Sequence, residues 1–212
     1  MKFSYFIFWF LFRIIFAAYF RWRICNPERV PMQGPVILAA NHASFLDPPL
    51  VGAALKRPLN YLARDTLFPV PVVGWLLRLW QVVPVDRDGS GAAGLRAIFD
   101  RLLRGGAILL FPEGTRTRDG KVQPARSGIG LVVIKSTAPV VPVRLFGTYE
   151  AYGRHLRFPR PRRVIVKFGP PLDFAKLRAE AKAASKQRLK GIYAQIADEI
   201  IQAIARLQPR ND

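Results

Sequence analysis

Short apolar runs rich in β-branched residues alternate with stretches of helical periodicity from Pro35 onward, and this alternation limits the possible folds more than any other feature. The runs predict strands at residues 36–40, 60–63, 81–85, 107–111, 140–146 and 164–168. Because these runs are almost continuously apolar, the strands are expected to be buried on both faces. The pattern therefore predicts the α/β class, with a mainly parallel central sheet flanked by helices.

The clearest helical stretch covers residues 94–104, where leucine, isoleucine and phenylalanine recur three and four positions apart. Two glycines, Gly105 and Gly106, follow it, as is typical of the end of a helix. The C-terminal stretch 173–207 is also predicted to be helical, with an isoleucine-rich stripe facing the core. Residues 148–163 are rich in tyrosine, proline and arginine, and they predict a long basic excursion before the last strand.

A single domain accounts for this pattern, because the chain contains neither an internal repeat nor a low-complexity linker. We assign it residues 30–212, with the chemically distinctive segments in residues 35–149 and a C-terminal strand and helices in residues 163–207. Cys25 is the single cysteine, which excludes an internal disulfide. The Cys/His spacing of zinc sites is also missing from the sequence, so we expect no metal.

A hydrophobic segment, residues 1–24, precedes this domain. Its run Phe3–Phe20 is crowded with aromatic rings and carries a single charge, Arg13. As a helix the run would measure roughly 27 Å, slightly less than the ~30 Å hydrocarbon core of a bilayer. Arg21 and Arg23 follow directly, where a cleavable signal peptide would need small residues. We therefore expect an N-terminal helix that anchors the chain to a membrane.

The charge of Arg13 leaves open how such an anchor meets the bilayer. A charge at the bilayer centre costs about 2.5–3.5 kcal/mol on insertion scales, so a shallow or re-entrant helix fits the run as well as a span does. A helix buried in a soluble core is the remaining alternative. The arginines after the segment place the domain on the cytoplasmic face of the membrane.

The net charge of +19, from 33 basic and 14 acidic residues, requires an anionic partner. Half of the residues are hydrophobic, which excludes a disordered polyelectrolyte. Nucleic acid, an anionic membrane surface and phosphorylated substrates are all compatible with this charge. A membrane-tethered nucleic-acid-binding protein that uses residues 154–163 is thus an alternative function, although no segment resembles a known nucleic-acid module.

His42 and His155 are the two histidines, which limits the candidates for a base that works at neutral pH. His42 follows the strand run 36–40, at the end where open α/β sheets bind their ligands. Asp47 stands five positions further on, too far around an ideal helix for the two side chains to meet. They meet if His42 lies in the strand-to-helix turn and Asp47 opens the helix.

Two prolines after Asp47, Pro48 and Pro49, support this arrangement, because proline is tolerated in the first helical turn. An aspartate there would hold the imidazole in one tautomer and stabilise the imidazolium that forms when it takes a proton. An ordinary turn residue and an N-cap aspartate explain the same pattern equally well. Ser44 adds the option of a Ser-His-Asp triad, although the G-x-S-x-G sequence typical of one is missing.

A second polar cluster, Glu113, Gly114, Thr115 and Arg116, follows the strand run 107–111. Glycine permits a close backbone approach, the hydroxyl donates, and a guanidinium binds phosphate with two parallel hydrogen bonds. An anion-binding loop is therefore expected at the same sheet edge as His42, with a plain polar turn as the alternative.

A third basic position, Arg87, follows the strand run 81–85. Alone it is a weak indication, because Asp86 and Asp88 flank it and can neutralise its charge on the surface.

Together, three segments resemble blocks one, three and four of the glycerolipid acyltransferases, the family of the 1-acylglycerol-3-phosphate (lysophosphatidate) O-acyltransferases. The segments are Asn41-His42-x4-Asp47, Phe111-Pro112-Glu113-Gly114-Thr115-Arg116 and Pro139-Val140-Val141-Pro142-Val143. They occur in the family's order and spacing, over roughly residues 35–149. The first segment alone is a common accident, but its pairing with the second is specific.

The resemblance implies transfer of an acyl group from acyl-CoA or acyl carrier protein to the sn-2 hydroxyl of 1-acylglycerol-3-phosphate, giving phosphatidic acid without a further cofactor. His42 would be the general base, and Asp47 would orient it. The resemblance assigns the glycerol phosphate to Glu113, Gly114, Thr115, Arg116 and Arg87, and it assigns the lining of the acyl or acceptor pocket to Val141, Pro142 and Val143. The partners would be membrane lipid and the acyl thioester.

In two places the sequence departs from the family pattern. Val83-Pro84-Val85 stands where block two usually contains an aromatic residue, and Ala125-Arg126-Ser127-Gly128 stands where an aromatic-lysine pair often precedes glycine. Acylation of glycerol-3-phosphate, another lysophospholipid or an amino-acid lipid therefore remains an alternative. Arg126 keeps a positive charge at its position, so we expect it to contact the acyl carrier or a phosphate.

Overall fold

The computed structural model describes residues 3–79, 82–85 and 92–209. At its centre lies a six-stranded sheet with the strand order β1-β8-β7-β2-β6-β3. The strands are β1 (Arg23–Cys25), β2 (Val36–Ala40), β3 (Leu59–Asn60), β6 (Ala107–Leu110), β7 (Val140–Phe146) and β8 (Ile165–Phe168). Every neighbouring pair is parallel except β7 and β8, which are antiparallel. The predicted α/β fold with a mainly parallel sheet is confirmed.

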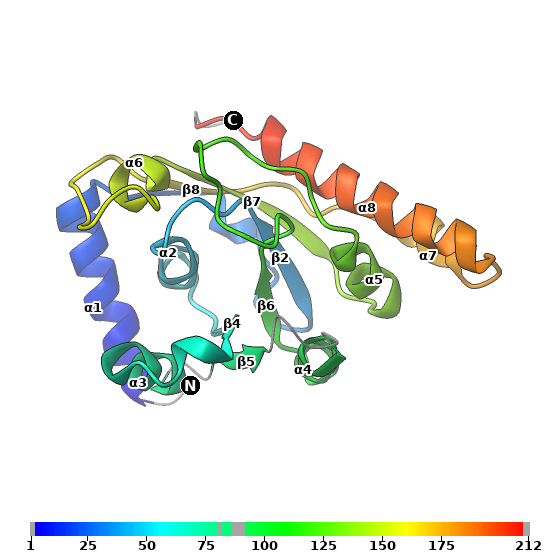
Figure 1. The fold of residues 1–212 in the computed structure, drawn as a ribbon, viewed down its shortest axis with the longest axis horizontal. Coiled ribbons are helices and arrows are strands. Elements are labelled where there is room, and N and C mark those ends of the chain that lie inside the picture. The colour runs from blue at the N-terminus through cyan, green and yellow to red at the C-terminus, as the bar shows by residue number, and fades with distance from the viewer. Residues whose placement is uncertain (1–2, 80–81, 86–91, 210–212) are drawn as a thin grey trace.

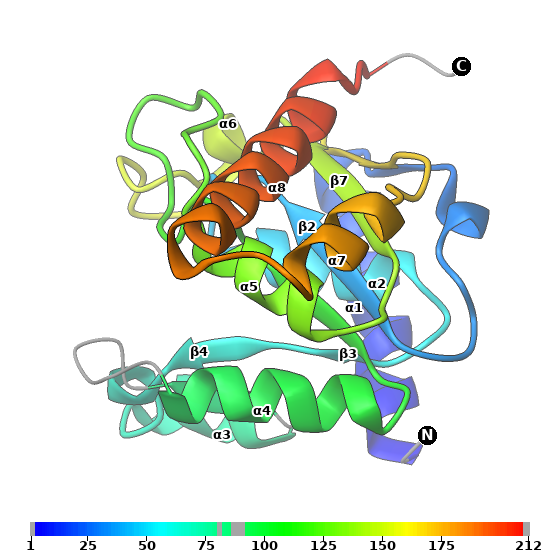
Figure 2. The same cartoon turned by 90° about the vertical axis from the view of Figure 1, so that its right-hand side faces the viewer.

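Helices cover both faces of this sheet (Figure 1). On one side lie α1 (Phe3–Phe20) and α2 (Asp47–Ala54). The other side carries α4 (Ala92–Leu103), α5 (Gly128–Lys135), α7 (Ala175–Ala181) and α8 (Lys186–Arg206), with α8 lying across the sheet in Figure 2. The two layers explain the continuous apolar runs, because successive side chains of a strand point to opposite faces.

The central strand β2 shows this arrangement directly. Val36, Leu38 and Ala40 belong to the core cluster on the α2 side. Ile37 and Ala39 belong to the cluster that includes the isoleucines of α8. All five residues are fully buried, so β2 has no solvent-facing side and needs no polar residue.

The short strands differ from the sequence prediction. The predicted strand at residues 60–63 is divided, because Leu59–Asn60 joins the main sheet while β4 (Leu62–Arg64) does not. Instead, β4 pairs with β5 (Val83–Val85) in a separate two-stranded parallel sheet. Strand β1 was not predicted, since it is three residues long and begins with an arginine. It forms because β8 offers it a free edge for pairing.

The C-terminal helical stretch is interrupted between α7 and α8, where Ser185 caps α8 by accepting a hydrogen bond from the backbone N–H of Arg188. The basic excursion begins with a short helix, α6 (Thr148–Tyr152), and then continues without regular structure to β8. The remaining helices are α3 (Pro71–Leu79), which precedes β5, and two 3-10 turns at Pro27–Arg29 and Asp65–Leu67.

The N-terminal apolar run forms α1, and this helix has two different faces. Phe16 and Phe20 are 2% and 3% exposed and belong to the core. The other face carries exposed apolar side chains, at Ile7, Phe10, Leu11, Ile14, Ile15 and Tyr19. Across the described ranges, no helix combines the length and the apolar character that crossing a membrane requires.

Candidate active site

His42 and Asp47 lie together at the carboxyl end of β2, as their spacing predicts. The Nδ1 atom of His42 is 2.8 Å from Oδ2 of Asp47. His42 belongs to the turn after the strand, and Asp47 is the first residue of α2. The two prolines that follow Asp47 fit this first turn, where a backbone N–H has no helical partner.

The Asp47 carboxylate also organises the turn around itself. Its Oδ2 atom accepts hydrogen bonds from the backbone N–H groups of Ala43, at 2.6 Å, and Ser44, at 2.7 Å. Since the carboxylate is an acceptor, Nδ1 of His42 donates to it, and the Nε2 atom is left to take a proton. The imidazole ring stacks on Phe111 with 3.9 Å between ring centres, so its orientation is held from two sides.

Ser44 is fully buried, and its hydroxyl is occupied by the backbone. The Oγ atom donates to the carbonyl oxygen of Tyr152 at 2.8 Å and accepts from the N–H of Leu46 at 3.0 Å. A hydroxyl committed in this way does not face the ring of His42. The geometry excludes the triad option and makes Ser44 a link between the His42 turn and α6.

The loop after β6 lies beside the His42 turn because β2 and β6 are neighbouring parallel strands. Two hydrogen bonds join them: His42 N–H donates to Oε1 of Glu113 at 2.9 Å, and Thr117 N–H donates to the carbonyl of His42 at 2.8 Å. The second oxygen of Glu113 accepts from the N–H of Gln123 at 3.3 Å. The carboxyl group of Glu113 therefore binds two backbone segments to each other.

Glu113 is 4% exposed, and burial raises the pKa of its carboxyl group to about 7. The hydrogen bonds from His42 and Gln123 oppose this shift, as does the positive charge of Arg144. Arg144 follows the Val141-Pro142-Val143 segment on β7 and was not expected at the site. No sequence motif marks it, because its proximity to Glu113 depends on how β7 and β6 flank β2.

Beyond Glu113, basic and hydroxyl side chains surround a pocket of about 300 Å³, lined by Thr115, Arg116, Thr117, Arg118, Asp119, Gln123 and Arg154. Arg154 donates from Nη2 to Oγ1 of Thr115 at 2.8 Å. Asp119, the acidic residue of this lining, accepts hydrogen bonds from Thr117, Lys121 and Gln123. Three guanidinium groups around one pocket make it suited to an anion.

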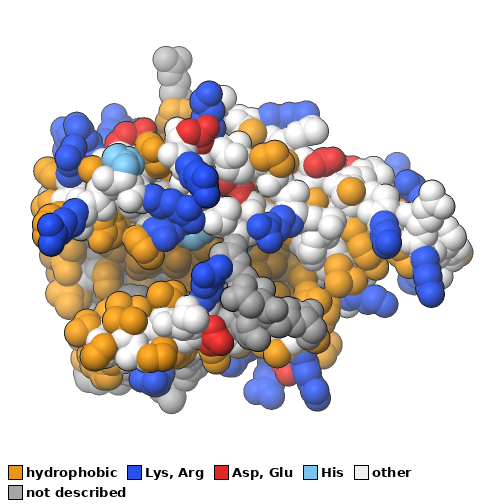
Figure 3. All heavy atoms as spheres, viewed as in Figure 1, with side chains coloured by type: hydrophobic (Ala, Val, Ile, Leu, Met, Phe, Trp, Pro, Cys, Tyr) orange, Lys and Arg blue, Asp and Glu red, His pale blue; other side chains and the backbone are white. Residues whose placement is uncertain are grey.

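The guanidinium carbon of Arg116 lies 3.4 Å from the centre of the Phe45 ring. Burial lowers the pKa of Arg116, and the charge of Arg154 lowers it further. Arg154 comes from the basic excursion and was not predicted as a site residue. A local pattern could not have identified it, although the arginine content of residues 148–163 is a general signal. In Figure 3, basic side chains gather over α6 and the neighbouring loops, beside a hollow in the surface.

Gly114 and Arg126 are in direct contact. Gly114 has a φ of +69°, and a Cβ atom added to it would lie 2.7 Å from Nε of Arg126. The backbone N–H of Arg126 donates to the carbonyl of Pro112 at 2.8 Å. The left-handed backbone conformation favours glycine at position 114, and a larger residue there would also displace the side chain of Arg126.

The remaining predicted site residues are Val141, Pro142, Val143 and Arg87. Val141, Pro142 and Val143 are buried within β7, next to β2, so their assignment to an acyl or acceptor pocket stays a prediction. Arg87 lies outside the described residues. Within the parts of the chain that are described, no three His, Cys, Asp or Glu side chains come together as metal ligands.

This chain is similar to proteins of one family. A family model described as Acyltransferase matches residues 21–145. A 1-acyl-sn-glycerol-3-phosphate acyltransferase of Borreliella burgdorferi is 27% identical over 189 residues, covering 87% of this chain and 72% of that protein. One from Bacillus subtilis is 27% identical over 177 residues, covering 79% and 86%.

Plant relatives are longer. The chloroplastic 1-acyl-sn-glycerol-3-phosphate acyltransferase BAT2 of Brassica napus is 33% identical over 116 residues, covering 54% of this chain. The chain spans about a third of the length of such chloroplast proteins.

The fold is that of the crystal structure of the 1-acyl-sn-glycerophosphate (LPA) acyltransferase PlsC from Thermotoga maritima. The two structures share a TM-score of 0.72 at 24% identity, over 96% of this chain and 80% of the other. The family model covers more than half of the sequence, and its range includes both the His42–Asp47 pair and the loop that carries Arg116. This chain belongs to the acyltransferase family.

Proposed function

We propose that the protein transfers an acyl group from an acyl thioester to the free sn-2 hydroxyl of 1-acylglycerol-3-phosphate, giving phosphatidic acid. The observation that carries this proposal is the hydrogen-bonded His42–Asp47 pair, which the backbone of His42 joins to a loop whose arginines line a pocket of about 300 Å³. The names of the relatives from Borreliella burgdorferi and Bacillus subtilis support the choice of acceptor.

In this mechanism, Nε2 of His42 takes the proton of the acceptor hydroxyl as its oxygen attacks the thioester carbonyl. The tetrahedral intermediate then collapses, the carbon–sulfur bond breaks, and the thiolate leaves with the proton that the imidazolium returns. Asp47 holds the ring through Nδ1 and stabilises its positive charge between these two steps. An acyl-enzyme intermediate is not required.

The acceptor phosphate would bind Thr115 and Arg116, with Arg118 and Arg154 completing the positive lining. Gly114 lets the loop turn closely, and Glu113 supports the loop from beneath, because both of its oxygens accept backbone N–H groups. We keep Arg87 as a further contact to the substrate phosphate. We keep Arg126 as a contact to a phosphate or to the acyl carrier, which is CoA or acyl carrier protein. No metal and no further cofactor takes part.

We further propose that α1 attaches the protein to the cytoplasmic face of a membrane by lying on the bilayer rather than crossing it. One face of α1 packs into the core, and the opposite face exposes Phe10 and Ile14, which are 54% and 52% exposed. Figure 3 shows hydrophobic side chains gathered on the side of the molecule where α1 and α3 lie. A helix of this kind suits the interfacial zone of a bilayer.

Product analysis by mass spectrometry tests the reaction. Purified protein in detergent is offered lysophosphatidate, glycerol-3-phosphate, other lysophospholipids and an amino-acid lipid, each with acyl-CoA and with acylated carrier protein. We expect phosphatidic acid from lysophosphatidate, and far less of it from the His42→Ala variant. A protein that acylates none of the phosphate-bearing acceptors would contradict the proposed substrate.

A further inference from the structure

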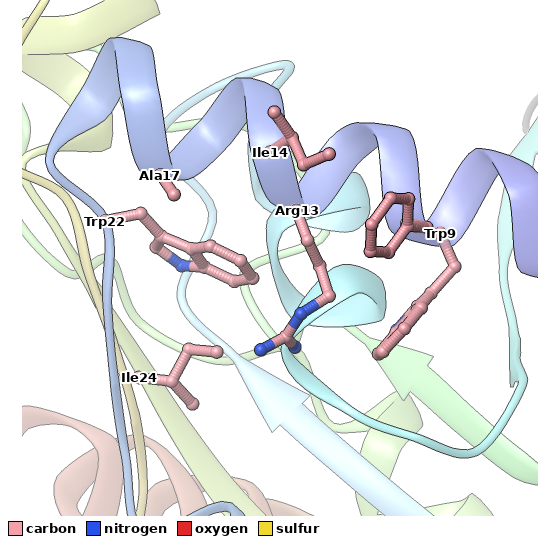
Figure 4. Close-up of a pocket in the computed structure, with 7 residues that line it drawn as sticks. Trp9, Arg13, Ile14, Ala17, Trp22 and Ile24 are labelled. Atoms are coloured by element: carbon pink, nitrogen blue, oxygen red, sulfur yellow. The ribbon is translucent and has the colours of Figure 1, made fainter.

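A second pocket, separate from the His42 site, lies beneath α1. It has a volume of about 430 Å³, and its labelled lining residues are Trp9, Arg13, Ile14, Ala17, Trp22 and Ile24 (Figure 4). Two indole rings form its walls, and the side chain of Arg13 extends from α1 into the space between them. Neither the proposed reaction nor the family resemblance uses these residues.

Arg13 is a half-buried charge that contacts a carbonyl and two aromatic rings. Its Nη1 atom donates to the carbonyl of Ala53 at 2.8 Å, and its guanidinium carbon lies 4.8 Å from the Trp9 ring centre and 5.5 Å from that of Trp22. Among the residues that the structure describes, Arg13 pairs with no carboxylate. A guanidinium has five donors, so most of its hydrogen-bonding capacity is available to a ligand.

The pocket is continuous with the exposed apolar face of α1. Phe10 and Ile14 line the pocket and are also among the exposed residues of that face. An amphiphile can therefore place its acyl chain along α1 and its headgroup against Arg13. A positive charge at the border of an apolar surface is stabilised by an anionic headgroup.

We propose that this pocket binds the phosphate group of an anionic phospholipid, with Arg13 as its charged contact and Trp9 and Trp22 on either side. The inference rests on the proposed attachment of α1 to a membrane. It assigns to that helix a lipid-binding site in addition to its apolar surface.

A purely structural role for Arg13 is the competing explanation. Arg13 and Trp9 both donate to carbonyls at the C-terminal end of α2, those of Ala53 and Leu55. A glutamine at position 13 can still donate one such hydrogen bond but carries no charge. Arg13→Gln therefore separates the two roles, and Arg13→Lys, which keeps the charge, serves as a second variant if the first folds poorly.

Fluorescence quenching by brominated lipids tests the site in the full-length chain. The background carries Trp75→Phe and Trp80→Phe, so that Trp9 and Trp22 are the remaining tryptophans. Vesicles contain phosphatidylcholine and phosphatidylglycerol at one fixed ratio, with bromine on the chains of one lipid or of the other. Because one charge-assisted contact corresponds to about a tenfold preference, we expect markedly stronger quenching per lipid from phosphatidylglycerol.

The three variants are expected to differ in their preference for phosphatidylglycerol. Arg13→Gln is expected to abolish the preference for phosphatidylglycerol, whereas Arg13→Lys and the matched control Arg21→Gln retain it. Equal quenching by both lipids, or equal loss of preference in Arg13→Gln and Arg21→Gln, overturns the site but leaves the membrane attachment standing. Quenching by neither lipid overturns the attachment itself, and the site with it. Acyl transfer is measured separately, so none of these outcomes depends on the proposed reaction.

Discussion

Two arginines of this molecule lie against aromatic rings, and their surroundings differ in kind. Arg116 lies 3.4 Å from the Phe45 ring centre and shares its pocket with two more arginines and two threonine hydroxyls. Arg13 lies 4.8 Å from the Trp9 ring centre in a pocket with apolar walls. The first environment directs many polar donors to one point, which suits a phosphate held for reaction. The second offers one charge at the border of an apolar face, which suits a lipid headgroup.

Among the changes proposed here, removal of the general base His42 should lower the reaction rate most. We expect His42→Ala to lower kcat by about 10²–10⁴, the usual contribution of a general base. His155→Ala is the matched control, because His155 is exposed on the excursion and contacts the Tyr149 ring rather than Asp47. Steady-state kinetics with lysophosphatidate measures both variants. Similar losses in the two would show that the base has been assigned to the wrong histidine.

Replacing a phenylalanine by alanine should have different effects on the two faces of α1. Phe16 is 2% exposed, so Phe16→Ala should lower the free energy of unfolding by about 3–5 kcal/mol. Phe10→Ala should change it by less than about 0.5 kcal/mol, because Phe10 is 54% exposed, but should weaken binding to vesicles. Denaturant unfolding in detergent and vesicle co-sedimentation measure these effects. If Phe10→Ala bound vesicles as the unchanged protein does, the outer face of α1 would not contact lipid.

Removal of single arginines from the phosphate pocket should raise KM more than it lowers kcat. One hydrogen bond to a charged group contributes about 1.5–3 kcal/mol, so Arg116→Gln should raise KM for lysophosphatidate roughly 10- to 100-fold. Arg154→Gln should have a smaller effect, since Arg154 is more exposed and reaches the site through Thr115. Kinetics with phosphate-bearing acceptors tests both, and Arg206→Gln on α8 is a control for net charge. An unchanged KM in Arg116→Gln would contradict the pocket assignment.

The smallest expected effect is that of Glu113 on how the free energy of unfolding depends on pH. Because burial raises its pKa from 4.5 to about 7, the folded protein binds a proton there that the unfolded chain has lost. The stability contributed by this group is therefore present at low pH and is lost as the pH rises from about 4.5 to about 7. In Glu113→Gln, the free energy of unfolding should decline less steeply over this interval. Denaturant titrations at several pH values measure the two slopes, and identical slopes would contradict the assignment.

Long strands buried on both faces were predictable, and short edge strands were not. The ends of β2 and β7 match the prediction, because β2 is apolar over its whole length and β7 is apolar except for Arg144. Strand β1 was missed, and β4 with β5 was assigned to the wrong sheet, because two- and three-residue strands carry little periodicity of their own. Their formation depends on which neighbour offers an unpaired edge.

In the active site, too, some contacts could be predicted from the local sequence and others could not. The His42–Asp47 contact was predictable because a turn of five residues leaves few arrangements once a strand precedes it and prolines follow it. Arg154 and Arg144 could not be predicted from their local sequence, because they reach the site from the basic excursion and from β7. The contacts that Arg13 makes with the carbonyl of Ala53 and with the rings of Trp9 and Trp22 could not be predicted from the apolar run either.

The sequence by itself therefore determined the family, the alternation of strand and helix, and the local chemistry that follows each strand. The tertiary structure alone decided that β2 lies between β7 and β6, that Glu113 binds the His42 turn, and that α1 is half buried. The physical reason is the range of the interactions. Turn geometry and helix starts depend on neighbouring residues, whereas strand order, burial and the meeting of charges depend on segments far apart in the chain.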